Sequence, residues 1–296
     1  MLPVIFGISG TELSQGEIDF FAQHRPHGII LFGRNCKEAT QIRGLTNSIK
    51  NILGTDVKIF IDQEGGRVAR IKPPITETIY PNMAYFGEMY KIHGAQDAIS
   101  AVKNNYFKLM SELKTFGIDV TCAPVCDIYY EGAHKVIGDR SFGSNLEIVV
   151  TLCKAALEGI HTAGGEGVIK HIPGHGRADV DSHLDLPVVS DSLKDLEGSD
   201  FAVFKSLSDS CPYAMTAHVK YTCLDEELPV TISKKCINYI RSDIGFTSQI
   251  MTDDICMKAL GGTIQDRVGM SLKAGCDIIL HCSGKIQEMV DVVMVL

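Results

Sequence analysis

Residues 57–70, VKIFIDQEGGRVAR, join a short apolar run to a loop that is rich in charges and glycine. The apolar run is dominated by β-branched and aromatic side chains, which is typical of a buried strand. Gly65 and Gly66 allow the backbone to turn tightly directly after it. The pattern therefore predicts a strand with Asp62 at its carboxyl end and Arg70 able to reach back to it, either as part of a site or as an ion pair that stabilises the loop.

The same alternation of short strands and longer helical segments runs along the whole sequence. Such repeated strand–helix units are typical of a parallel sheet. Strands are expected at residues 4–9, 28–32, 57–62, 119–124, 167–171, 213–217, 249–253 and 277–281. Helices are expected at residues 37–53, 95–116, 146–163, 193–208, 233–244, 264–274 and 285–296.

The number of strands favours one architecture. Eight strands in 296 residues fit a closed (β/α)8 barrel better than an open, doubly wound sheet, and no GxGxxG follows the first strand. We therefore predict an α/β fold in which residues 1–296 form a single catalytic TIM-type barrel. The chain ends soon after the eighth strand, so the last helix is expected to be short and the barrel could be incompletely closed.

Composition narrows the classes of function. The net charge of -8 and the lack of a basic run argue against a nucleic-acid partner. No export signal and no apolar stretch long enough to span a membrane is apparent, so we expect a cytoplasmic protein, monomeric or weakly self-associating, without a cofactor. The ten cysteines are interpreted as reduced thiols, because a large chain with a full core and no export signal does not need disulfides. Cys122 and Cys126 have no second Cys pair with zinc-ribbon spacing, which argues against structural zinc.

The densest cluster of polar chemistry is KHIPGHGRADVDSH, residues 170–183. His171 and His175 have the spacing of helical metal ligands, but the Pro-Gly pair between them prevents the helix that would align them. A metal site in the loop, formed by Asp179, Asp181 and His183, remains an alternative and would make the protein a metal-dependent barrel hydrolase.

Two further groups complete a candidate active site. Asp181 and His183 are two residues apart, so the carboxylate can hold one imidazole nitrogen and raise the basicity of the other. Asp253 and Asp254 follow the apolar run 249–252 and are expected at the same rim of the barrel. An Asp at such a position can serve as the covalent nucleophile of a retaining glycosidase, and which of the two acids does so is left open.

At this point the sequence resembles family 3 glycoside hydrolases of the bacterial β-N-acetylhexosaminidase type. The resemblance rests on a series of motifs that run in family order along nearly the whole chain: DQEGGRV at 62–68, APVCD at 123–127, GDRSF at 138–142, KHIPGHG at 170–176, DSH at 181–183, MTAH at 215–218 and TDDICM at 252–257.

The resemblance implies a retaining, two-step mechanism. Asp253 would attack the anomeric carbon, and His183, supported by Asp181, would protonate the leaving oxygen and then deprotonate water. The sugar-binding residues implied are Asp62, Arg70, Arg140, Lys170 and His171. The implied substrate is a small sugar or muropeptide, with N-acetylglucosamine removed from anhydro-muramic acid during cell-wall recycling.

Two related functions are alternatives to a hydrolase. A phosphorylase with the same dyad would gain from a histidine acid/base, because a carboxylate would repel the incoming phosphate. A catalytically silent sugar-binding protein is disfavoured, because every acid needed for turnover is present.

Overall fold

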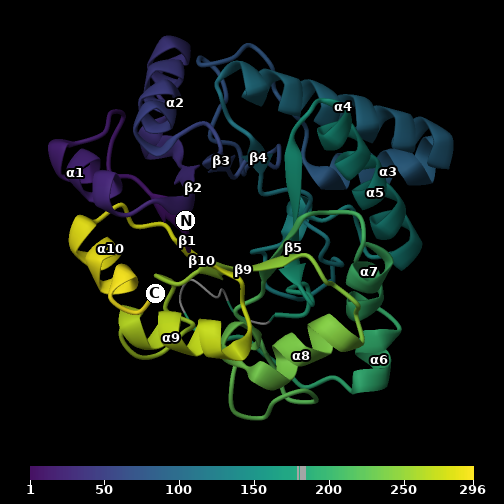
Figure 1. Cartoon of the computed structure of the whole chain (residues 1–296). Coiled ribbons are helices and arrows are strands. Elements are labelled where there is room, and N and C mark those ends of the chain that lie inside the picture. The colour runs from purple at the N-terminus through teal and green to yellow at the C-terminus, as the bar shows by residue number, and fades with distance from the viewer. Residues whose placement is uncertain (179, 181–184) are drawn as a thin grey trace.

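The structure, a computed structural model, describes residues 1–178, 180 and 185–296. Within them, eight parallel strands close into a barrel in the order β1-β10-β9-β7-β5-β4-β3-β2, and helices surround it (Figure 1). The barrel strands are β1 (Leu2–Gly7), β2 (Pro26–Leu31), β3 (Lys58–Ile61), β4 (Val120–Thr121), β5 (Glu166–Ile172), β7 (Tyr213–Thr216), β9 (Gln249–Asp254) and β10 (Ile278–His281). The predicted (β/α)8 architecture is thereby confirmed.

The barrel closes between its first and last strands, where Val4 of β1 lies opposite Ile279 of β10. The expectation that closure could be incomplete was therefore wrong. The expectation of a short last helix is confirmed, because α10 (Ile286–Val293) has 8 residues. A short helix suffices because β10 obtains its hydrogen-bond partners from β1 and β9.

The surrounding helices follow the predicted order, with two differences. The other helices are α1 (Gln15–Gln23), α2 (Ala39–Leu53), α3 (Met83–His93), α4 (Ala95–Thr115), α5 (Leu146–Thr162), α6 (Leu193–Glu197), α7 (Asp200–Ser206), α8 (Lys234–Ser242) and α9 (Ile264–Ala274). The helix expected at residues 193–208 is two helices, because the chain breaks at Gly198 and Ser199. Helices α1 and α3 were not expected, although Ser14 and Asn82 cap them in the usual way.

Successive side chains of each strand point to opposite faces of the barrel wall. In β1, Ile5 belongs to a cluster inside the barrel, whereas Val4 and Phe6 belong to the larger core that includes residues of the helices. Phe60 and Tyr213 meet edge to face inside the barrel, with ring centroids 5.5 Å apart. These buried side chains fill the barrel interior and hold the strand ends in fixed positions.

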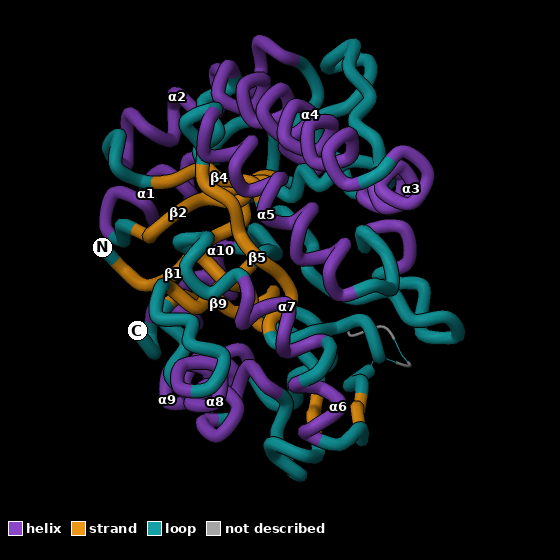
Figure 2. The backbone as a smooth tube through the Cα atoms, turned by 90° about the vertical axis from the view of Figure 1, so that its right-hand side faces the viewer, coloured by secondary structure: helices purple, strands orange, loops and turns teal. Residues whose placement is uncertain are grey.

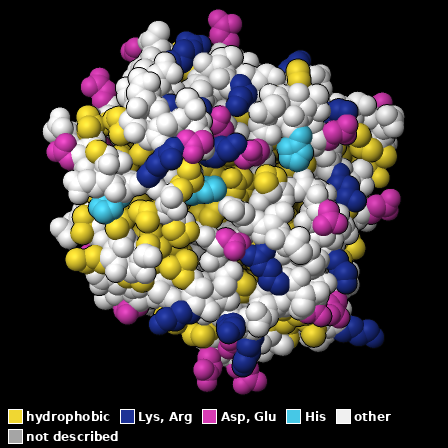
Figure 3. All heavy atoms as spheres, in the orientation of Figure 1, with side chains coloured by type: hydrophobic (Ala, Val, Ile, Leu, Met, Phe, Trp, Pro, Cys, Tyr) yellow, Lys and Arg dark blue, Asp and Glu magenta, His cyan; other side chains and the backbone are white. Residues whose placement is uncertain are grey.

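Figure 2 shows both chain termini on one side of the barrel, the side where the strands begin. The opposite side carries α3 and the small sheet of β6 (Val188–Val189) and β8 (Lys220–Tyr221). On the face with the termini, acidic and basic side chains are interspersed (Figure 3). In the described part of the chain, no helix is long and apolar enough to cross a membrane.

Candidate active site

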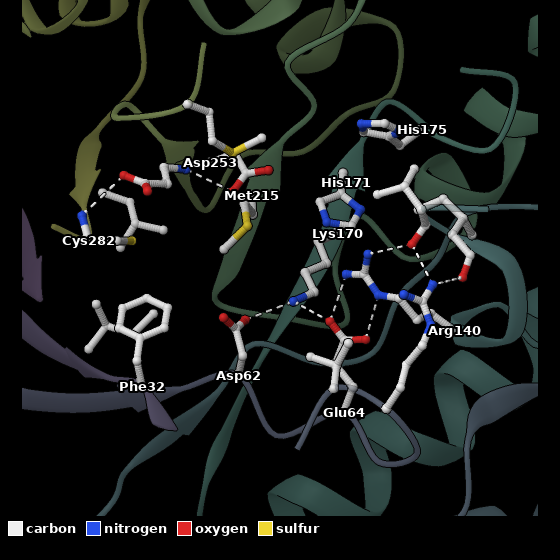
Figure 4. Close-up of a pocket in the computed structure, with 18 of the residues that line it drawn as sticks. Phe32, Asp62, Glu64, Arg140, Lys170, His171, His175, Met215, Asp253 and Cys282 are labelled. Carbon is white, nitrogen blue, oxygen red and sulfur yellow. Dashed lines mark hydrogen bonds and ion pairs between the residues drawn. The ribbon is translucent and has the colours of Figure 1, made fainter. Parts of the chain in front are cut away.

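A cavity of about 420 Å³ lies at the carboxyl ends of the strands, where barrels of this kind place their active sites. Figure 4 shows its labelled residues converging from several strands and loops. The cavity brings together every described residue of the predicted site: Asp62, Arg70, Arg140, Lys170, His171 and Asp253. Asp179, Asp181 and His183 lie outside the described residues, so the structure does not place the predicted dyad or the loop metal site.

The loop after β3 makes the tight turn that was expected from Gly65 and Gly66. Gly65 and Gly66 have φ angles of 99° and 59°, which L side chains rarely adopt. A side chain at Gly65 would also collide with the carbonyl oxygen of Pro81, at 2.3 Å. The turn brings Arg70 back to Asp62, with Nη2 3.1 Å from Oδ2, which confirms the predicted pair.

Lys170 is the centre of a buried ionic network at the bottom of the cavity (Figure 4). Its Nζ lies 3.0 Å from Oδ1 of Asp62 and 2.7 Å from Oε1 of Glu64. Arg140 forms a bidentate ion pair with Glu64, in which Nε and Nη2 of the arginine each lie 2.8 Å from one carboxylate oxygen. This planar, two-bond geometry is specific to arginine.

The network holds both carboxylates in their charged form. Burial alone would raise the pKa of Asp62, but the charges of Lys170 and Arg70 hold it well below its usual range. Burial opposes ionisation of Glu64 as well, and Arg140 and Lys170 lower its pKa to about 2. At neutral pH the cavity therefore presents fixed charges and hydrogen-bonding groups in place before any ligand arrives.

His171 is oriented by a carboxylate that lies behind it. Asp127 Oδ2 lies 2.7 Å from Nδ1 of His171, and Oδ1 accepts the backbone N–H of His175 at 2.7 Å. The carboxylate therefore fixes the orientation of the imidazole ring through Nδ1. Only glycine fits at position 176 in this turn, because a Cβ atom there would lie 1.9 Å from the carbonyl oxygen of Ile128.

Asp253 and Asp254, the last residues of β9, both line the cavity but differ in their bonds. Asp254 Oδ1 accepts the backbone N–H groups of Cys256 and Cys282, at 3.0 and 3.1 Å. Among the described residues, Asp253 Oδ1 accepts one hydrogen bond, from the neighbouring N–H of Asp254, and none donates to its Oδ2. Burial would raise the pKa of Asp253, but its electrostatic interactions with His218 and His171 keep that pKa below its usual range.

His218 lies behind this pair and bonds to backbone and hydroxyl groups. Its Nε2 lies 3.0 Å from the carbonyl oxygen of Asp254, and its Nδ1 lies 2.7 Å from Oγ1 of Thr231. His218 thus orders the end of β9 through hydrogen bonds.

Three residues of the site were not predicted. Glu64 and Asp127 belong to quoted motifs, but nothing in their spacing separated them from solvated acids. Arg177 holds the start of the loop that follows β5: its Nε lies 2.7 Å from Oδ2 of Asp200, and its Nη1 lies 2.7 Å from Oδ1 of Asp191. Asp200 and Asp191 are 23 and 14 residues away from Arg177 in sequence, so no local pattern revealed these contacts.

A closed barrel with ionised carboxylates and cations around one cavity at its carboxyl end has the construction of a barrel enzyme. The model of the glycosyl hydrolase family 3 N-terminal domain matches residues 9–296, and the chain belongs to this family. The chain is thus a glycoside hydrolase.

Relatives and solved structures agree with this assignment. The chain is 37% identical over 286 residues to a β-hexosaminidase of Alkalilimnicola ehrlichii, covering 95% of this chain and 80% of that protein. It is similar to the crystal structure of NagZ from Neisseria gonorrhoeae in complex with N-trifluoroacetyl-D-glucosamine, with a TM-score of 0.90 and 36% identity over 99% of this chain and 83% of that one. A family 3 β-N-acetylglucosaminidase from Paenibacillus also has a TM-score of 0.90, at 29% identity, and the match covers 99% of this chain and 56% of that one.

Proposed function

We propose that this protein is a retaining exo-β-N-acetylglucosaminidase that removes terminal β-linked N-acetylglucosamine through a covalent intermediate on Asp253. The observation that carries the proposal is the placement of Asp253, ionised and only lightly bonded, in the same cavity as the polar network around Lys170. The β-hexosaminidase relatives and the glucosamine derivative bound to the Neisseria gonorrhoeae protein support the choice of sugar.

The buried network would hold the sugar. Asp62, Arg70, Lys170, His171 and Arg140 offer both charged acceptors and charged donors, and these form strong hydrogen bonds to neutral hydroxyl groups. Because the network is already assembled, little reorganisation is needed when the sugar binds. Arg140 would act mainly through Glu64, to which both of its planar bonds are made.

Asp253 is the better nucleophile of the two acids, because Asp254 is occupied with two backbone N–H groups. In the first step, an oxygen of Asp253 would form a bond to the anomeric carbon as the bond to the leaving oxygen breaks. The leaving oxygen keeps the electron pair of the broken bond and accepts a proton from His183, whose ring Asp181 would support. In the second step, His183 would take a proton from water, which displaces Asp253 and restores the enzyme with net retention.

The substrate proposed is a fragment of the bacterial cell wall in which N-acetylglucosamine is joined to anhydro-muramic acid. This finer assignment rests on the family resemblance and on the names of the relatives.

The direct experiment compares chromogenic β-N-acetylglucosaminide with the matching β-glucoside, in neutral buffer, in phosphate and with a chelator. We expect the acetamido sugar to be preferred, free N-acetylglucosamine to be the product in every buffer, and the chelator to have no effect. Sugar 1-phosphate in the phosphate buffer would identify a phosphorylase instead. Activity lost on chelation would identify a metal-dependent hydrolase, and equal turnover of the β-glucoside would refute the acetamido preference.

A further inference from the structure

Three side chains of the types that bind zinc converge beside Asp254. Cys256 follows β9, His281 ends β10, and Glu288 lies in the first turn of α10. One ligand atom from each lies within 4.8 Å of the other two. None of the three lines the catalytic cavity, so this cluster is a separate feature of the molecule.

The His281 ring lacks the hydrogen bonds that a buried imidazole normally makes. It is fully buried, and its Nδ1 has no hydrogen-bond partner among the described residues. Its Nε2 has only long contacts, at 3.4 Å, to Oε2 of Glu288 and Oγ of Ser283. Buried polar groups in native proteins are almost always bonded, so this ring points to a group that the described residues do not supply.

The local charges favour a cation. Glu288 uses Oε1 to pair with Lys285, at 2.9 Å, which leaves Oε2 facing His281. The carboxylate of Asp254 lies next to the cluster, because its Oδ1 accepts the backbone N–H of Cys256. Lys285 is 71% exposed and is therefore well screened by solvent. The nearby Arg267 directs Nη1 to the carbonyl oxygens of Ile255 and Met257, on either side of Cys256.

We propose that Cys256, His281 and Glu288 bind a divalent transition-metal ion, for which Zn²⁺ is the best match. Thiolate, imidazole and carboxylate are the three usual zinc ligands in proteins, and water would supply the fourth position. With Zn–S about 2.3 Å and Zn–N about 2.0 Å, ligands of one ion lie about 3.5 Å apart. The partly exposed side chains of Cys256 and Glu288 need only close by roughly 1 Å to reach this geometry.

Binding is an exchange of a proton for the metal ion. The Cys256 thiol loses its proton to solvent as the sulfur–metal bond forms, and no electron is transferred. The ion would join the ends of β9 and β10 to the start of α10. It would therefore hold the last strand–helix unit against the strand that carries Asp253, as a structural clamp that takes no part in the chemistry.

The test is a Co²⁺ titration of the full chain, read from the thiolate-to-cobalt charge-transfer absorption in the near ultraviolet. We expect this band in the wild type, its loss in Cys256→Ser, and its retention in Cys223→Ser, which changes the other partly exposed cysteine. Glu288→Gln should weaken binding by at least about tenfold, because it removes a charged ligand. Zn²⁺ at 100 times its dissociation constant should favour the folded wild type about 100-fold, and should not stabilise Cys256→Ser.

The titration also separates this site from one in the loop after β5. A metal held only by Asp179, Asp181 and His183 would give no thiolate band, and its binding would be lost in His183→Ala. That result, or a band that survives Cys256→Ser, would overturn the proposal. If Cys256→Ser fails to fold, unchanged Co²⁺ affinity in Glu288→Gln would overturn it equally.

Discussion

Lys170 and Asp62 form a buried ion pair at the bottom of the catalytic cavity, with Nζ 3.0 Å from Oδ1. Glu64 shares the same ammonium, at 2.7 Å, so one lysine bridges two carboxylates that are 16% and 1% exposed. The pair therefore links stability with ligand binding: the charges that would receive a sugar also hold the ends of β3 and β5 together.

We expect Lys170→Met to lower the free energy of unfolding by up to about 3–5 kcal/mol, because it removes the cation that two buried carboxylates share and leaves each of them with a single arginine. Urea unfolding measures this loss. The matched control is Lys58→Met, which breaks the half-exposed pair with Glu166 and should cost no more than about 1 kcal/mol. Equal losses in the two variants would contradict the central role of Lys170.

Asp253→Asn should nearly abolish turnover while the unfolding midpoint stays close to that of the wild type. Asp254→Ala should instead cost stability, about 1–3 kcal/mol, because two backbone N–H groups lose their acceptor. An activated fluoro-sugar should label Asp253, and peptide mass spectrometry locates the label. A label on Asp254 would reverse the assignment of the nucleophile.

His183→Ala should slow substrates with poor leaving groups by about 10²–10⁴, the usual contribution of general acid catalysis. Aryl glycosides with good leaving groups should suffer less in the first step, so the intermediate on Asp253 should accumulate and give a burst of aryl alcohol. Asp181→Asn should slow the same proton-transfer steps, because His183 would lose the carboxylate that supports its ring. If good and poor leaving groups slow alike and neither azide nor formate restores activity, the acid/base is another residue.

His175 should make stability depend on pH. Burial and the neighbouring charge of His171 lower the pKa of His175 from 6.5 to about 4. Between these values the unfolded chain binds a proton that the folded chain does not, so the free energy of unfolding rises with pH. The contribution, about 3 kcal/mol, is present above about pH 6.5 and is lost as pH falls towards 4.

Chemical unfolding at several pH values tests this. His175→Gln should flatten the slope between pH 4 and 6.5. His161→Gln changes an exposed histidine on α5 and should leave the slope unchanged. Unchanged slopes in both variants would show that His175 does not carry the effect. The buried His218 and His281, whose pKa values are also lowered, account for any slope that remains.

The strands were predictable because a barrel strand is a local object. Its core-facing residues lie within about five positions, as in β3, and charged residues mark its end. The helices were harder to predict. Helix α1 begins with a capping box of Ser14 and Glu17, but its apolar face is too narrow to give a clear helical pattern in the sequence. The break between α6 and α7 lies at Gly198, which helix periodicity alone does not reveal.

The site was predictable as far as single motifs reach. Asp62 and Arg70 are eight residues apart, and their pairing follows from the glycine turn between them. The bidentate grip of Arg140 on Glu64 spans 76 residues, and the bond between Asp127 and His171 spans 44. Such pairs depend on which strands become neighbours in the barrel, and only the folded chain supplies that information.

The closure of β1 on β10 also constrains how the protein is made. At roughly 5–20 residues per second, the ribosome needs on the order of 15–60 seconds to deliver the partner of β1. During that time the edge of β1 that Ile279 will cover has no strand beside it. Unpaired, apolar strand edges recruit other chains. The nascent chain is therefore most exposed to aggregation before its last strand emerges, and its yield in the cell should depend on chaperones that shield this edge.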